Sequence, residues 1–305
     1  MMFNSKIKRG LSISSSQLSW VEIDSSSSSK PDIKISANES LPEGLVKPFF
    51  AKRNIDDREA FKFAIEKLIP GGHMTGDIAL SIPDHIAKIT SLKFDDLPDS
   101  RQEVEQLILW RMKKTVPLPV ADIKLDFISY KANDGTVDVA ASVASRLVLR
   151  EYEDVLKEMG LRPRLVDIAS INTLRAFETA IPESSLFIEL SEDSLGMAIL
   201  DEGRLGFFRS KEVEGSSDKV LSDKVKREIV STLAYLRTTF PEKEIATICF
   251  HSTIPGLEEI IKGLEAGFEG SIVNLSVSDY ISEAEAGSDN IDEHLAPAIG
   301  GALRL

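Results

Sequence analysis

The first part of the chain alternates apolar and polar residues in short stretches that predict β-strands. Apolar side chains alternate with small polar ones at Leu11 and Ile13, and the serines at 14–16 then interrupt the pattern. The alternation resumes through Trp20, and another strand pattern follows at 32–36. Together these stretches predict a β-hairpin that turns at the serines and leads into a third strand.

Helical spacing of apolar residues appears between the next strand patterns. Asp56 with Glu59 indicates the start of one helix, because a capping side chain and a glutamate three residues later satisfy free amide groups. Ser100 with Glu103 indicates the start of a second helix in the same way. The stretch Asn-Asp-Gly at 133–135 predicts a tight hairpin between two further strands.

The second half of the chain repeats this order. Strand patterns at 185–190, 195–200 and 205–210 form a second meander. A long helix is expected at 218–239, and a buried strand is expected at 245–250. A strand meander followed by alternating helices and strands thus occurs twice, which predicts an α/β protein with two similar halves.

The charge and composition of the chain limit the kinds of partner that it can bind. The net charge of -13 and the pI near 4.9 disfavour nucleic acid, because phosphate binding needs clustered Lys and Arg. The basic runs at 6–9 and 111–114 are interpreted as solvated faces or helix C-termini. No apolar run reaches the ~18 residues that span a bilayer, and no secretory signal pattern is present, so we expect a cytoplasmic, non-transmembrane protein. The single cysteine, Cys249, is expected in a buried strand, and the histidines lack the spacing of a zinc site.

Five segments carry a resemblance to a known family. They are RGLSISSSQLSWVEI at 9–23, IALSIPDHIAKI at 78–89, EVEQLILWRMKKTVPLPVADIKLDF at 103–127, VLKEMGLRPRLVDIASINTLRAF at 155–177 and LAPAIGGALRL at 295–305. In these segments the chain resembles the type IV pilus assembly protein PilM family and the related cytoplasmic part of the secretion protein GspL. The resemblance covers nearly the whole chain, and the third and fourth segments are its most specific part.

The resemblance implies an α/β protein with the actin-like ATPase fold. In that fold two RNase H-like lobes form a nucleotide cleft, and the first lobe would here carry an inserted α+β subdomain. The family order places the first lobe at residues 1–177 plus 291–305, with the insertion at about 80–147. The second lobe is expected at 178–290.

Three corners of the implied nucleotide cleft depart from the family pattern. Where the family has an aspartate and a glycine in its first turn, this chain has Ser12 and Ser14. The matching positions of the second turn are Glu189 and Ser191, and His-Ser at 251–252 replaces a Gly-Gly turn on the adenosine side. Phosphoryl transfer needs a metal and a positioned water, and we assign no residue to either. We therefore expect a degenerate cleft that binds magnesium ATP weakly or not at all and does not hydrolyse it.

The residues of this expected cleft each have a second interpretation. The candidate nucleotide-contacting residues are Ser12, Ser14, Ser15, Ser16, Glu189, Ser191, Gly300 and Gly301. Serine hydroxyls could still bond a phosphate, but they also form turns without any ligand. Glu189 could hold a metal through water, or it could face a helix end or solvent. The two glycines could lie beside an adenine, or they could allow close packing of a helix.

The resemblance also implies a protein partner. In the family, a groove between the first lobe and the inserted subdomain receives an extended cytoplasmic tail from a PilN-like membrane protein. The helix at 100–114, the turn at 116–119 and the strand after it would build that groove, and an open strand edge could add the tail as a further strand. The candidate partner-binding residues are Trp110, Val116, Pro117 and Pro119. Trp110 would be an anchor if exposed and a core residue if not.

Two classes of function follow. The first is a non-enzymatic scaffold, peripheral at the inner membrane, that contacts the PilN-like tail and other pilus assembly platform proteins. The second is an ATP-binding, nucleotide-regulated ATPase of the same machinery, in which nucleotide exchange changes the angle between the lobes. A small-molecule kinase of the same superfamily is a third alternative. The Pro-x-Pro segment favours the pilus branch, and the altered turns favour the scaffold.

Overall fold

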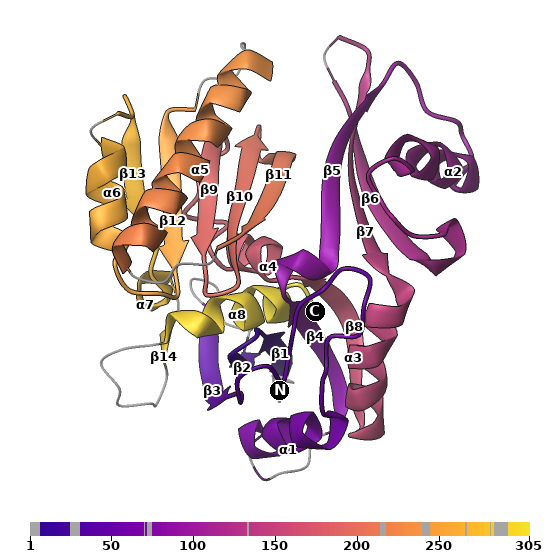
Figure 1. Ribbon diagram of the computed structural model, residues 1–305, viewed down its shortest axis with the longest axis vertical. Coiled ribbons are helices and arrows are strands. Elements are labelled where there is room, and N and C mark those ends of the chain that lie inside the picture. The colour runs from indigo at the N-terminus through magenta and orange to yellow at the C-terminus, as the bar shows by residue number, and fades with distance from the viewer. Residues whose placement is uncertain are drawn as a thin grey trace, which may run out of the picture.

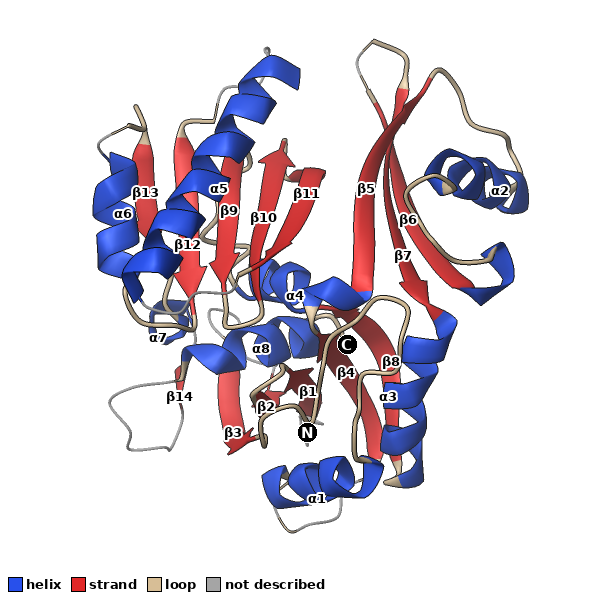
Figure 2. Cartoon of the chain, in the orientation of Figure 1, coloured by secondary structure: helices blue, strands red, loops and turns tan. Residues whose placement is uncertain are grey.

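Three β-sheets with helices packed on their faces form the framework of the protein (Figure 1). The structure is a computed structural model that describes residues 7–24, 31–69, 71, 75–132, 134–213, 218–239, 245–265, 267–280, 282–283 and 292–305. Residue 133 of the predicted hairpin lies outside the described residues. In Figure 2 the six-stranded sheet lies at the bottom, the five-stranded sheet at the upper left and the three-stranded sheet at the upper right.

The six-stranded sheet combines strands from both ends of the chain, in the order β14-β3-β2-β1-β4-β8. The strands are β1 (Ile7–Ile13), β2 (Gln17–Asp24), β3 (Asp32–Ser40), β4 (Gly76–Ile82), β8 (Leu161–Ile168) and β14 (Ser282–Glu283). The predicted first hairpin is present, with Leu11 opposite Trp20 in an antiparallel pair. β14 pairs with β3, although we expected its residues in the second lobe.

Helices from three parts of the chain pack against this sheet. They are α1 (Arg58–Leu68), α3 (Arg146–Glu158), α4 (Ala169–Ala176) and α8 (Ala296–Leu303), with the short turns η1 (Asp84–Ile86) and η3 (Glu293–Leu295). The cap of α1 is Asp57 and not Asp56: its side chain accepts the N–H groups of Glu59 and Ala60. Two adjacent aspartates satisfy the same sequence rule, and only the backbone path decides which one precedes the helix.

The five-stranded sheet is formed by the second half of the chain, in the order β11-β10-β9-β12-β13. Its strands are β9 (Ser185–Leu190), β10 (Ser194–Asp201), β11 (Arg204–Glu212), β12 (Thr247–Ser252) and β13 (Ser271–Asn274). Its helices are α5 (Asp218–Thr239), α6 (Leu257–Glu265) and α7 (Val277–Tyr280). Helix α5 has the predicted bounds, and Cys249 is buried in β12 as expected.

The three-stranded sheet lies apart from the other two and has the order β5-β7-β6. Its elements are β5 (Ala87–Phe94), α2 (Arg101–Met112), the short turn η2 (Val120–Asp122), β6 (Ile123–Lys131) and β7 (Val137–Ser145). One face packs against α2 in a hydrophobic core of its own, which includes Phe94 and Ile108. Ser100 precedes α2 as predicted, but its side chain makes no capping hydrogen bond. The opposite face of the sheet is turned towards α4 and β11, and the Ser91 hydroxyl donates to the Gly206 carbonyl at 2.7 Å.

Candidate functional site

Two hairpin turns meet between the two larger sheets. The turn between β1 and β2 carries Ser15 and Ser16, and the turn between β9 and β10 carries Glu192 and Asp193. The backbone N–H of Ser15 donates to Asp193 Oδ2 at 2.8 Å, and the Ser16 hydroxyl donates to a carboxylate oxygen of Glu192. Carboxylates of the second turn therefore accept hydrogen bonds from donors of the first turn.

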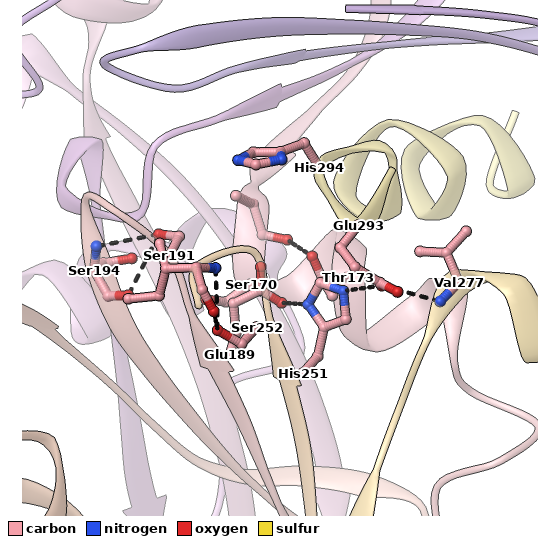
Figure 3. A network of polar contacts seen from close by, with 12 residues as sticks. Ser170, Thr173, Glu189, Ser191, Ser194, His251, Ser252, Val277, Glu293 and His294 are labelled. Atoms are coloured by element: carbon pink, nitrogen blue, oxygen red, sulfur yellow. Dashed lines mark hydrogen bonds and ion pairs between the residues drawn. The ribbon is translucent and has the colours of Figure 1, made fainter. Parts of the chain in front are cut away.

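Two other serines are used within their own turns. Ser14 Oγ accepts the Gln17 N–H at 2.9 Å and the Ser16 N–H at 3.3 Å. Ser191 Oγ accepts the Ser194 N–H at 3.2 Å in the second turn (Figure 3). Both hydroxyls stabilise a turn without any ligand, which is the simpler of the two interpretations of these serines.

A small cavity remains between the two turns. Its volume is ≈ 40 Å³, and its wall includes four of the sequence-predicted residues: Ser12, Ser14, Glu189 and Ser191. Sites for small molecules and cofactors usually enclose about 300–1,000 Å³. The space between the turns is therefore far smaller than such a site.

A buried histidine fills the adjacent corner of this region (Figure 3). The His251 side chain, at the end of β12, is fully buried and lies between two carboxylates. His251 Nδ1 is 3.3 Å from Glu189 Oε2, and His251 Nε2 is 3.0 Å from Glu293 Oε2. Glu189 is only 2% exposed, so its charge is screened little by water.

His251, Glu189 and Glu293 form a triad, called the His251 triad here, and the two carboxylates decide the protonation of the histidine. Burial disfavours the charged imidazole, but the negative charges of Glu189 and Glu293 outweigh burial and raise the pKa of His251 to about 9. Burial likewise opposes ionisation of Glu293, yet hydrogen bonds from His251 and Ser276 hold its pKa below the usual value. His251 is therefore a buried cation at neutral pH. It supplies a positive charge beside the buried Glu189 carboxylate.

A second buried carboxylate beside Glu189, that of Asp84 in η1, lines the small cavity. It accepts the Ser170 N–H at 3.0 Å and the Ser170 hydroxyl at 2.5 Å, and it also accepts the Ser194 hydroxyl at 3.1 Å. Burial raises the pKa of Asp84 despite these bonds. Its bonds connect the end of β4 to α4 and β10, so its oxygens are engaged in structure. In the described part of the chain, no group of three or more His, Cys, Asp or Glu side chains is arranged to hold a metal ion.

The predicted glycines lie in the core and not on the wall of this cavity. A Cβ on Gly300 would stand 1.7 Å from the carbonyl oxygen of Asn172 in α4. A Cβ on Gly301 would stand 3.2 Å from the Cβ of Ala79 in β4. Both glycines are buried, and Gly300 in particular allows α8 and α4 to approach closely. The packing interpretation of these glycines is the one that the geometry supports.

A second groove lies beside the three-stranded sheet. It has a volume of ≈ 440 Å³ and runs between β6, α4 and the β10–β11 hairpin. Its apolar wall includes Ile89, Ile128, Ile171, Leu174 and Leu205. Charged side chains stand around this wall: Asp126, Asp167, Arg175, Glu178, Glu183 and Arg304. Strand β6 forms one side of the groove and pairs only with β7 among the described strands, so its outer edge is open.

The predicted partner-binding residues do not line this groove. Trp110 is 69% exposed on α2, which covers the opposite face of the sheet. Val116 is buried in the core of the inserted sheet, whereas Pro117 and Pro119 are exposed in the connection that follows α2. The sequence left open whether Trp110 is exposed or part of the core, and it is exposed. It does not, however, line the groove beside β6.

Sequence reasoning missed the acidic residues that fill the cleft region. Glu192 and Asp193 read as ordinary turn residues, and Asp84 was not singled out. The acidic pair was visible in the sequence, but nothing along the chain shows that it lies opposite the turn after β1. Glu293 gave no signal, because its partner His251 is distant in sequence and comes close only through folding.

Comparisons with known proteins agree with the fold. A family model described as type IV pilus assembly protein PilM matches residues 10–218. No curated protein matches the chain. In the described residues, no helix is long and apolar enough to cross a membrane.

Solved structures give the same architecture. A structure described as the PilM-PilN type IV pilus biogenesis complex matches with a TM-score of 0.81 and 16% identity, covering 97% of this chain and 98% of that chain. The cytoplasmic domain of EpsL, an inner membrane component of the type II secretion system of Vibrio cholerae, matches with a TM-score of 0.53 and 12% identity, covering 97% and 94%. A Bacteroides thetaiotaomicron protein with an actin-like ATPase fold and unknown function matches with a TM-score of 0.52 and 9% identity, covering 96% and 95%. The protein thus has the actin-like ATPase fold, and with the family model matching most of its length, it belongs to the type IV pilus assembly protein PilM family.

Proposed function

We propose that this protein is a cytoplasmic scaffold of a type IV pilus assembly platform that captures the cytoplasmic tail of a PilN-like membrane protein. Family membership supports the pilus setting, and the similar structure described as a PilM-PilN complex supports the partner. The tail would hold the scaffold at the inner membrane, since the scaffold itself is proposed to be peripheral.

The open edge of β6 beside the ≈ 440 Å³ groove is the observation that carries this proposal. An unpaired strand edge offers N–H and C=O groups to an extended peptide, which could extend the sheet by one strand. The groove next to it offers an apolar wall for alternate side chains of such a peptide. Ile128, on β6, is 49% exposed and lines the groove, so it is a candidate contact.

The sign of the charge around the groove fits a membrane-protein tail. Asp126, Asp167, Glu178 and Glu183 outnumber Arg175 and Arg304. Asp167 pairs with Arg304, and Arg175 pairs with Glu178. Asp126 pairs with Arg101, which lies outside the groove, so Glu183 is left without an ion pair among the described residues. Cytoplasmic segments next to a membrane span carry an excess of Lys and Arg. An acidic rim would therefore attract such a tail.

The same proposal includes a cleft that no longer serves ATP. A magnesium nucleotide, the ligand that the family resemblance implies, fits poorly. The ≈ 40 Å³ cavity is too small, and carboxylates of the second turn accept hydrogen bonds from the donors of the first turn. The Glu189 carboxylate is paired with the His251 cation and is not free for a metal. These contacts favour the scaffold over the nucleotide-regulated alternative.

Tail binding tests this proposal directly. A labelled peptide with the sequence of the PilN-like cytoplasmic tail is titrated with the protein and with the variant Ile128→Asp, and binding is followed by fluorescence anisotropy. We expect the variant to weaken binding at least about fivefold, the change that corresponds to ~1 kcal/mol at an interface anchor. Val230→Asp is the matched control, because Val230 is 58% exposed on α5 in the other half of the molecule. Equal affinity of the protein and the Ile128→Asp variant would contradict the groove assignment.

A further inference from the structure

One face of the first half of the protein gathers basic and apolar side chains outside both sites described above. We call it the basic aromatic surface. It consists of Phe49, Lys52, Arg53, Trp110, Lys113, Lys114, Val120, Arg146, Leu147 and Arg150. All ten are exposed, in a protein whose net charge is -13. Such a positive area is unexpected on so acidic a chain.

Contacts show that its segments lie next to one another. Lys88 Nζ donates to the Thr115 carbonyl at 2.8 Å and lies 5.1 Å from the centre of the Phe50 ring, so it joins the loop around Phe49 to the connection after Trp110. A groove of ≈ 480 Å³ then joins Arg53 to the turn η2 and to the first turns of α3. In Figure 1, α2 and α3 lie one above the other on the right side of the molecule.

The apolar members are large and exposed. Trp110 is 69% exposed, Val120 is 58% exposed, and Phe49 and Leu147 are 48% and 47% exposed. Lys52 Nζ lies 5.6 Å from the centre of the Phe49 ring, so a cation and an aromatic ring stand together at the surface. Exposed indole and phenyl rings beside basic groups are typical of protein surfaces at a membrane interface.

The basic members are available to bind anions. Within the described residues, none of Lys52, Arg53, Lys113, Lys114, Arg146 and Arg150 forms an ion pair. The acidic groups that line the ≈ 480 Å³ groove together with Arg53, Arg146 and Arg150 are Asp122, Glu151 and Asp154. Glu151 is buried and accepts the Asn54 N–H at 2.6 Å, so its charge is directed inward. The surface keeps an excess of positive charge.

We propose that the basic aromatic surface binds anionic phospholipid headgroups directly, so that the protein has a lipid contact in addition to its proposed partner tail. The Lys and Arg side chains attract the negative surface, and Trp110 and Phe49 enter the headgroup region. This inference goes beyond the proposed function, since lipid binding requires no tail. The two contacts use different residues: the groove that we assign to the tail contains none of the basic aromatic surface.

Vesicle co-sedimentation without any partner tail tests the inference. The protein is mixed with vesicles of equal parts phosphatidylglycerol and phosphatidylethanolamine, or with vesicles of phosphatidylcholine alone. We expect binding to the anionic vesicles only. The combined variant Arg53→Ala, Lys113→Ala, Lys114→Ala should lower the partition coefficient roughly 100-fold, about fivefold per removed charge. Trp110→Ala should lower it as well while leaving the thermal unfolding midpoint unchanged.

Matched controls separate a specific surface from general charge. The combined variant Arg227→Ala, Arg237→Ala, Lys262→Ala removes the same number of exposed positive charges from α5 and α6, and it should bind vesicles like the unmodified protein. Equal losses in the two combined variants, or equal binding to neutral and anionic vesicles, would overturn the inference. A third outcome would also overturn it: vesicle binding unchanged in the Arg53, Lys113, Lys114 variant but affinity for the PilN-like tail lost, which would make the surface a protein-docking site. Loss of tail binding in Ile128→Asp with vesicle binding retained would leave the two proposals independently supported.

Discussion

The backbone N–H of Ser15 donates to Asp193 Oδ2 at 2.8 Å, which joins two turns that are distant in the chain. In a nucleotide-binding turn, such an amide would face a phosphate oxygen. Here a carboxylate of the same chain takes that position, and the neighbouring Glu192 accepts the Ser16 hydroxyl. These two contacts therefore join the halves of the protein at the place where a nucleotide-binding turn would hold its ligand.

Removal of the Asp193 carboxylate should destabilise the protein. We expect Asp193→Ala to lower the free energy of unfolding by about 1.5–3 kcal/mol, the usual contribution of a hydrogen bond to a charged group. Asp193→Asn should lose less, because its amide oxygen can still accept the Ser15 N–H. Urea unfolding measures both changes. Asp95→Ala serves as a control, since Asp95 is exposed, and an equal loss there would show that the Asp193 contact contributes nothing specific.

The His251 triad should make stability depend on pH in the alkaline direction. The pKa of His251 rises from 6.5 to about 9 on folding, so its stabilising contribution is complete below about pH 6.5 and is lost as the pH rises through about 9. The size of the effect is on the order of 3 kcal/mol. Urea unfolding midpoints measured across this pH window should fall steadily.

Substitution of His251 tests that assignment. His251→Gln leaves the buried Glu189 carboxylate and the partly exposed Glu293 carboxylate without their cation. It should cost about 3–5 kcal/mol near neutral pH, with a flatter pH profile. The double variant Glu189→Gln, His251→Gln should recover part of the loss, because it removes one of those carboxylates as well. A pH profile that stays as steep in His251→Gln as in the unmodified protein would assign the alkaline loss to another group.

Magnesium ATP should bind weakly or not at all. Calorimetric titration is expected to give no saturable heat, because the cavity of ≈ 40 Å³ cannot accept the ligand while the turns remain joined. Phosphate release should stay at the level of the buffer control. Micromolar affinity, together with turnover that disappears in Glu189→Gln, would establish the nucleotide-regulated alternative instead.

Gly300 should tolerate no side chain. On helix propensity alone, Gly300→Ala would stabilise α8 by about 1 kcal/mol. We expect the opposite sign, a loss of about 1–3 kcal/mol, because the new Cβ would overlap the Asn172 carbonyl oxygen at 1.7 Å. Gly301→Ala is the matched comparison: its nearest neighbour is 3.2 Å away, so its effect should be much smaller. Thermal unfolding distinguishes the two, and similar midpoints for both variants would argue against close packing of α8 on α4.

Individual helices and hairpins could be predicted from the sequence, because the periodic spacing of apolar residues is set by neighbours a few positions apart. The hairpin at Leu11 and Trp20 and the helix Asp218–Thr239 were predicted from apolar spacing, and both are present. The cap of α1 was misplaced by one residue, since Asp56 and Asp57 satisfy the same rule. The family order also led to the actin-like fold, which the structural comparisons bear out.

The sequence by itself determined most of the helices and strands, the strand meander that each half contains, and the serines in the turn after β1, but not β14 or α7. Only the tertiary structure decided what that turn contacts. The pairing of Ser15 with Asp193, and the position of His251 between Glu189 and Glu293, join residues that are far apart in the chain. Hydrogen bonds and ion pairs of this kind depend on how the sheets pack against one another. A periodic pattern along the chain does not show which distant residues this packing brings together.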